Sequence, residues 1–205
     1  MRIAVLGAGN IGATIGLKWA QAGHEVRMGV RDPGAPKYSD LKEGLPDTAQ
    51  LGTAGEALEP ASVVLLAIPG ASVAVTVADY GALLAGKILI DATNNVGAPV
   101  MNNIAALTEA VPDAQVFRTF NYLGWENFAD PGFGTERADL FYCGMPGQGQ
   151  EILEDLIRVL GLRPVYIGDL STVQILDNLT NLWFALALRQ GHGRHLAFKM
   201  LGDLE

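Results

Sequence analysis

Three glycines near the start of the chain constrain its fold more than any other feature. Gly7, Gly9 and Gly12 form a G-x-G-x-x-G pattern between the β-rich run Arg2–Leu6 and the helical run Ile11–Ala22. In that setting the first glycine allows a tight turn, the second lets the backbone approach a pyrophosphate, and the third lets helix and strand pack closely. The helix N-terminus adds free N–H groups for phosphates. The pattern predicts a dinucleotide site; the alternative is a glycine turn that serves packing alone.

The strand–helix alternation continues along the chain and predicts an α/β fold. Runs such as "VVLLAIP" and "KILIDAT" are continuously apolar, as expected of strands covered on both faces. We expect a doubly wound parallel sheet of the Rossmann type over residues 1–168. The expected strands are Arg2–Leu6, Glu25–Gly29, Thr48–Gly52, Ser62–Ile68, Lys87–Ala92, Ala114–Phe120, Ala138–Cys143 and Pro164–Ile167. The expected helices are Ile11–Ala22, Ser72–Leu84, Val100–Ala110 and Gln150–Leu160.

A small helical segment is expected after the sheet, over residues 169–205. No Gly or Pro interrupts Thr172–Gln190, which predicts one helix of about 28 Å. The helix is apolar on more than one face, so it must be buried on several sides. Gly191 and Gly193 then end it, and Arg194–Leu201 is expected to form a last short helix. So short a segment cannot build its own core, and we expect it to pack on the Rossmann domain and on a second subunit.

The end of the second strand indicates which dinucleotide is bound. Enzymes that use NAD commonly place an acid there to hold the ribose hydroxyls, whereas an arginine pairs with the 2′-phosphate of NADP. Here the strand ends on Val30 and Arg31 follows, with Lys37 close enough to add a second cation. NADP is therefore favoured. Two alternatives remain: Arg31 is a solvated partner of Asp32, or Asp32 itself holds the ribose in a shifted register, although Asp-Pro-Gly is typical of a turn.

Three further strand ends carry candidate cofactor contacts, because ligands of open α/β sheets bind beyond the carboxyl ends of the strands. Ile68 and Pro69 end the fourth strand with a turn that flanks the cofactor. Thr93 and Asn94 end the fifth strand and Asn121 the sixth, where hydroxyl and amide groups face the nicotinamide half. Thr93 and Asn121 are expected to position the reacting rings. The alternative for each is an ordinary capped turn.

A dedicated acid or base beside the hydride acceptor is not identified in the sequence. Tyr122 and Tyr142 are interpreted as aromatic core residues, and no Ser-His-Asp or Cys-His arrangement is found near Cys143. Hydride exchange between two cofactors needs mainly proximity, because the cofactors supply the chemistry. The segment "RQGHGRHLAFKM" concentrates cations in an acidic chain. It predicts a dock for an anionic cosubstrate, formed by Leu182, Trp183, His192 and Arg194, or else solvated charge at helix ends.

Composition excludes several other classes of protein. The 205 residues carry a formal net charge of −8, which argues against nucleic acid and anionic membrane as partners. The single cysteine excludes an internal disulfide, and no Cys or His spacing predicts a metal site. No signal peptide or membrane span is expected, so the sequence predicts a soluble cytoplasmic protein.

Several segments together resemble the F420-dependent NADP oxidoreductase family. They are "GAGNIGATIGLKWAQAGHEV", "GVRDP", "LLAIP", "ILIDATN", "FRTFNYLGWENF", "ADLFYCG" and "GHGRHLAFKML". The same domain type forms the cytosolic part of membrane ferric reductases. The resemblance implies a Rossmann domain with a small C-terminal helical portion and a homodimer. It also implies that Gly7, Gly9, Asn10, Ile11 and Gly12 hold the pyrophosphate and that Arg31 binds the 2′-phosphate. Val30 departs from the serine or threonine often found before that arginine.

The resulting functional hypothesis is hydride transfer between NADP(H) and a deazaflavin (F420) or flavin cosubstrate. Two alternatives stay open. One is reduction of an imine or a short hydroxyacid, although relatives of that kind generally carry a larger helical domain, and the hydroxyacid members use a lysine that the expected long helix Thr172–Gln190 lacks. The other is a regulatory module that binds NADPH without turnover.

Overall fold

In the computed structural model, which describes residues 1–202, eight strands form one sheet in the order β10-β9-β6-β5-β4-β1-β2-β3. Their bounds are β1 Arg2–Leu6, β2 Glu25–Val30, β3 Ala49–Thr53, β4 Val63–Leu66, β5 Ile88–Asp91, β6 Gln115–Arg118, β9 Asp139–Gly144 and β10 Arg163–Tyr166. All eight expected strands are therefore confirmed. Neighbouring strands run parallel except β6 and β9, which pair antiparallel through Phe117–Gly144 and Arg118–Cys143.

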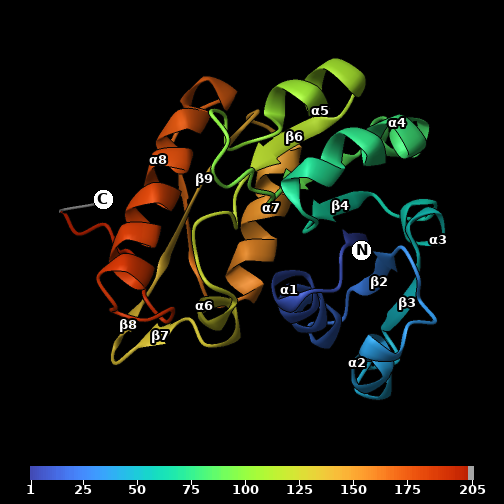
Figure 1. The fold of residues 1–205 in the computed structure, drawn as a ribbon, viewed down its shortest axis with the longest axis horizontal. Helices are drawn as coiled ribbons and strands as arrows, with labels where there is room; N and C mark the ends of the chain where they lie inside the picture. The colour runs from blue at the N-terminus through green and yellow to red at the C-terminus, as the bar shows by residue number, and fades with distance from the viewer. Residues whose placement is uncertain (203–205) are drawn as a thin grey trace.

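Helices cover both faces of the sheet (Figure 1). The longer ones are α1 Asn10–Gln21, α4 Val73–Leu84, α5 Ile104–Ala110, α7 Gln148–Val159 and α8 Val173–Phe184. Shorter elements that the sequence did not predict are α2 Ser39–Glu43, α3 Ala54–Leu58, α6 Trp125–Ala129 and the hairpin of β7 Gly132–Phe133 with β8 Glu136–Arg137. Helix α5 begins later than expected, because residues 100–103 form a loop whose Asn102 side chain accepts a hydrogen bond from Ile104 N–H at the helix start.

Two cores result from the alternation of side chains along the strands. Ile3 and Val5 of β1 face the core that α1, α7 and α8 cover, to which Trp19, Leu156 and Trp183 belong. Ala4 and Leu6 face the core that α3, α4 and α5 cover. The sheet is thus doubly wound, as the sequence predicted. Because β1 lies between β2 and β4, the chain winds in opposite directions from this strand, and a crevice is expected at its carboxyl end.

The C-terminal segment is helical only in its first part. Helix α8 continues into a π-helical turn over Ala185–Arg189. The expected long helix is therefore confirmed, and its last turn is wider than that of an α-helix. The expected helix Arg194–Leu201 is wrong: residues 194–202 are irregular. Their backbone groups bond to other elements instead of to each other. Phe198 C=O accepts from Asp139 N–H at 2.9 Å, and Met200 N–H donates to the Asp139 carboxylate at 2.7 Å.

Within residues 1–202 no helix has both the length and the apolar character that crossing a membrane requires. The same residues contain no cluster of His, Cys, Asp and Glu side chains suited to hold a metal ion.

Candidate functional site

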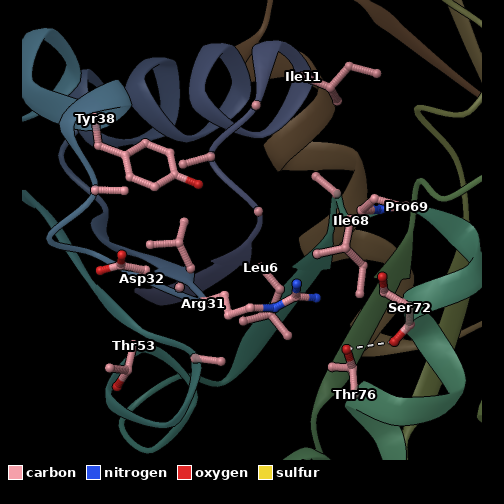
Figure 2. Close-up of a pocket in the computed structure, with 18 of the residues that line it drawn as sticks. Leu6, Ile11, Arg31, Asp32, Tyr38, Thr53, Ile68, Pro69, Ser72 and Thr76 are labelled. Atoms are coloured by element: carbon pink, nitrogen blue, oxygen red, sulfur yellow. Dashed lines mark hydrogen bonds between the residues drawn. The ribbon is translucent and has the colours of Figure 1, made fainter.

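A cavity of about 1180 Å³ opens at the carboxyl ends of β1, β2 and β4, at the point where the winding reverses. One wall is the glycine turn and the start of α1. A second is the loop after β2 together with the end of β3. A third is the β4–α4 connection with the exposed side of α4. Figure 2 shows side chains from all three walls converging on one space. This is where an open α/β sheet binds its ligand.

The glycine turn has the geometry that the sequence pattern requires. Gly7 has φ +99°, a left-handed conformation that other residues rarely adopt, and its N–H donates to Gly29 C=O at 2.9 Å. A Cβ built on Gly12 would lie 2.0 Å from the Gly7 carbonyl oxygen, so only glycine lets α1 pack this closely on the turn. Gly9, Asn10 and Ile11 line the cavity where α1 begins. The first N–H groups of a 12-residue helix therefore face the cavity.

Two cations and a tyrosine line the part of the cavity beside β2. Arg31 extends its side chain into the cavity, and Tyr38 faces it from the loop above (Figure 2). Lys37 Nζ lies 4.9 Å from the Tyr38 ring centroid. Asp32 also lines the cavity and accepts a hydrogen bond from Gly34 N–H at 2.9 Å, which is the turn chemistry that the sequence predicted. This part of the cavity can receive an adenosine that carries an anionic group.

The opposite wall is formed by the β4–α4 connection. Ile68 and Pro69 line the cavity, as expected, the turn before α4 adds Ser72, and α4 itself adds Thr76 and Tyr80. Thr76 donates its hydroxyl hydrogen to Ser72 C=O at 2.8 Å, so it is bonded within its own helix (Figure 2). The sequence did not predict that side chains of α4 line the cavity. A helical pattern alone does not indicate which face of the helix borders a ligand.

The predicted polar residues after β5 and β6 lie behind the cavity wall. Thr93 and Asn121 are buried, with exposed fractions of 1% and 4%, and neither they nor Asn94 line the cavity. Thr93 bonds Asp91 and Asn103, whereas Asn121 donates to Thr180 of α8 at 2.8 Å. In the structure these side chains position neighbouring segments, and their expected contact with the nicotinamide half stays a prediction.

One fully buried arginine connects this polar network. Arg118 of β6 donates to Asp91 at 2.9 Å, to Asn94 Oδ1 at 2.8 Å and to Asp177 of α8 at 3.0 Å. The side chains of Asp91 and Asp177 are at most 1% exposed. The network therefore fixes α8 and the loop after β5 to the sheet, and that loop in turn lies against Gly70, since a Cβ built on Gly70 would be 2.3 Å from Asn95 Oδ1.

Helix α6 and the C-terminal segment form a corner of the cavity away from Arg31. Trp125 and Arg194 line it, although they lie far apart in the chain. Arg194 Nε donates to Glu126 at 2.7 Å, and the guanidinium lies 5.6 Å from the Trp183 ring centroid. In Figure 1, α6 and the last residues lie across α1 from α2 and β3. We call this pair, Trp125 and Arg194, the distal corner.

The four residues of the expected cosubstrate dock do not lie together in the cavity. Arg194 lines it, but Trp183 is buried, and its indole N–H donates to Leu196 C=O at 2.8 Å beneath Arg194. Leu182 is 47% exposed on another side of α8, because successive helical residues point about 100° apart. His192 is exposed and lies outside the cavity lining. Trp125 was not singled out from the sequence, although it stands inside the segment "FNYLGWENF".

The remaining candidate acids and nucleophiles are held within the protein. Burial raises the pKa of Tyr122 and of Tyr142, and both hydroxyls are hydrogen bonded, to Asp139 C=O and to Glu154. Burial also raises the pKa of the Cys143 thiol to about 11, so it stays protonated at neutral pH. His24 lies beside the N-terminal amine of Met1, and partial burial lowers its pKa. None of the four lines the cavity.

Known proteins resemble this chain in sequence and in fold. Residues 2–95, which contain the glycine turn and the loop after β2, match the family of NADP oxidoreductases described as coenzyme F420-dependent. An F420-dependent NADP reductase of Methanothermobacter marburgensis is 36% identical over 99 residues, 45% of this chain and 44% of that protein. A crystal structure from Arthrobacter sp. FB24, named provisionally as an F420-dependent NADP reductase, superimposes with a TM-score of 0.86 at 27% identity. The alignment covers 98% of this chain and 100% of that one.

A membrane-protein relative extends the match further along the chain. The mouse metalloreductase STEAP2 is 26% identical over 187 residues, 90% of this chain. The matched part is only 37% of that protein, so this chain spans about a third of the length of the curated relatives that it first matches. The family and these relatives consist of oxidoreductases, and the predicted resemblance is confirmed. Residues 2–95 therefore match the F420-dependent NADP oxidoreductase family in sequence, and the chain shares its fold with the Arthrobacter protein over nearly the whole length.

Proposed function

We propose that this protein transfers a hydride between NADP(H) and a flavin or deazaflavin cosubstrate. The pyrophosphate lies on the start of α1 against Gly9, Asn10 and Ile11, and Arg31 with Lys37 receives the 2′-phosphate. The nicotinamide then extends past Ile68 and Pro69 toward the distal corner. The cofactor supplies the hydride, and the protein binds and orients the two rings.

The observation that carries this proposal is the chemistry of the distal corner. Among the described residues that line the cavity, the ionisable ones are Arg31, Asp32, Lys37, Tyr38, Asp79, Tyr80 and Arg194. All except Arg194 come from the loop after β2 or from α4, and an arginine stays charged at every working pH. The distal corner thus offers an indole and a guanidinium that, within the described part of the chain, is paired with Glu126 through Nε only. That pair suits a planar acceptor with an anionic group and does not offer a proton to a carbonyl or an imine.

Arg194 is the group we assign to the anionic part of the cosubstrate. Glu126 holds its Nε, and Trp183 supports the guanidinium plane from below. Nη1 and Nη2 have no hydrogen-bond partner among residues 1–202, so they are available to a ligand. Thr93 and Asn94 support the site from behind by holding the loop after β5, and Asn121 does so by holding α8.

Mixing the purified protein with NADPH and oxidised F420 tests this function. We expect enzyme-dependent bleaching of the deazaflavin absorbance, faster with NADPH than with NADH. Arg194→Gln should raise the KM for F420 about tenfold with little change in the KM for NADPH, because one charge-assisted hydrogen bond is lost. FMN and FAD are tested in parallel. NADPH binding without turnover of any of the three acceptors would reject the proposal and favour an imine substrate or a regulatory role.

We further propose that the protein forms a homodimer through the exposed side of α8. Ile175 and Leu182 are 57% and 47% exposed. Leu179 and Leu186, half-buried, complete a stripe with them at helical spacing. A stripe of four large apolar residues on one helix is unusual for a monomer surface and is typical of a subunit interface.

The dimer is tested by light scattering coupled to size-exclusion chromatography. The molar mass that light scattering gives for the wild-type protein should be twice the chain mass of 21.7 kDa. Leu182→Glu should give monomers, because a carboxylate would be buried at the interface. Val159→Glu is the matched control, since Val159 is 38% exposed on α7 and away from the stripe. A wild-type monomer, or equal effects of the two substitutions, would contradict the proposed interface.

A further inference from the structure

The end of β3 lies beside the end of β2 and offers a hydroxyl group there. Val30 and Thr53 are paired in register across the two parallel strands. Paired residues of parallel strands project to the same face of the sheet at adjacent positions. Both residues line the cavity, and Figure 2 shows Thr53 beneath Asp32, at the edge of the space into which the Arg31 side chain extends. The Val30 side chain contributes no polar atom, whereas its partner at the end of β3, Thr53, carries a hydroxyl.

A 2′-phosphate needs more donors than Arg31 alone supplies. The phosphate monoester presents three peripheral oxygens, whereas a guanidinium binds at most two of them side by side. Lys37 is a second cation, on the loop beyond Asp32. A short hydroxyl donor at the strand end would complete the set, and Thr53 stands at that position.

We infer that Thr53 is a specificity-determining residue that donates its hydroxyl to the 2′-phosphate of NADP(H). This inference rests on the proposed function, because it assumes that Arg31 binds the same phosphate. In the structure the Thr53 hydroxyl donates to Glu56 Oε2 at 2.8 Å, as part of the cap of α3. Rotation about the Cβ–Oγ1 bond redirects that hydrogen and leaves Oγ1 in place to accept from Glu56 N–H.

The cap of α3 survives this change of acceptor. Thr53 N–H also donates to Glu56 Oε2 at 2.8 Å, so the carboxylate keeps a backbone donor when the hydroxyl turns away. These hydrogen bonds from Thr53 lower the pKa of Glu56, which is therefore ionised at neutral pH. Glu56 itself does not line the dinucleotide cavity. The hydroxyl thus exchanges one anionic acceptor for another, and the expected gain in NADPH affinity is modest and selective.

Direct binding of NADPH and NADH to variants of Thr53 tests the inference. Thr53→Val keeps the β-branched shape and removes the hydroxyl. It should raise the Kd for NADPH about fivefold, because one hydrogen bond to a charged group is lost. The Kd for NADH should stay unchanged. Thr53→Ser keeps the hydroxyl and should bind NADPH as the wild type does. NADH affinity and the thermal midpoint report any loss of the α3 cap, because such damage affects both dinucleotides alike.

A rescue experiment makes the test specific to this position. Val30→Thr introduced into Thr53→Val should restore the preference for NADPH, since the new hydroxyl projects from the paired position. Val30→Ile in the same background has the same branching without the hydroxyl and should restore nothing. Unchanged NADPH affinity in Thr53→Val, or equal loss for NADPH and NADH, would overturn the inference. Arg31→Ala separates the two claims: selective loss of NADPH there keeps the 2′-phosphate site even if Thr53 plays no part.

Discussion

Replacing Gly9 by alanine is expected to weaken NADPH binding about 100-fold without destabilising the fold. Gly9 has φ −79° and ψ −173°, which any residue can adopt, and a Cβ built on it meets nothing within 4 Å. Since Gly9 lines the cavity at the start of α1, the added methyl group enters the space of the pyrophosphate. Titration of dihydronicotinamide fluorescence measures the affinity. An unchanged Kd would place the phosphates away from this turn.

Gly12→Ala is the matched comparison and should affect both properties. Its Cβ would lie 2.0 Å from the Gly7 carbonyl oxygen and 3.2 Å from the Ala67 side chain, so α1 must move away from β1. We expect a loss of about 3 kcal/mol in the free energy of unfolding, as for other overpacked sites, together with lost binding. For Gly9→Ala the change in stability should stay under about 1 kcal/mol. Chemical denaturation of both variants distinguishes a ligand clash from a packing clash.

The second large effect is expected at the buried arginine. Arg118→Met should lower the free energy of unfolding by about 3–5 kcal/mol, because Asp91 and Asp177 then remain buried without their cationic partner. Asp91 keeps the N–H and hydroxyl of Thr93, and Asp177 keeps the Asn102 amide at 2.7 Å. Those neutral donors do not replace a positive charge in a site closed to water.

An exposed ion pair in the same chain provides the control for Arg118. Arg158 bonds Glu154 at 2.6 Å and Asp155 at 2.8 Å, which are distances as short as those of the buried pair, but its side chain is 54% exposed. Arg158→Met should cost less than about 1 kcal/mol, because solvent screens the pair. Urea denaturation of both variants gives the comparison. Similar losses would mean that the buried network contributes no more than a surface pair.

The features that the sequence predicted best depend on local pattern. The glycine triplet, the continuously apolar strands and the basic loop after β2 each specify their structure within a few residues, and each is found where expected. A local signal was also overlooked: Thr53-x-x-Glu56 is a capping-box spacing, and it begins α3. That signal would also have directed attention to Thr53.

The distal corner could not be predicted, because it depends on packing between distant segments. Trp125 and Arg194 meet only after α8 has reversed the chain and residues 194–200 have bonded to β9. The same long-range bonds explain the wrong helix at Arg194–Leu201, since a backbone whose groups are bonded to a neighbouring strand cannot form helical bonds. The prediction that Leu182 and Trp183 form one dock fails for a related reason. They are adjacent in sequence, but on a helix they point in different directions, so Leu182 is exposed and Trp183 is buried.

The placement of the tryptophans has a practical consequence. Trp125 lines the distal corner, and Trp183 lies directly beneath Arg194, so two of the three indoles belong to the part of the site assigned to the cosubstrate. Trp19 is buried in the core, with its N–H bonded to Leu156 C=O at 2.9 Å. The protein therefore contains its own optical reporter: ultraviolet emission from that corner registers ring stacking and energy transfer to a bound dihydronicotinamide, with no extrinsic dye attached.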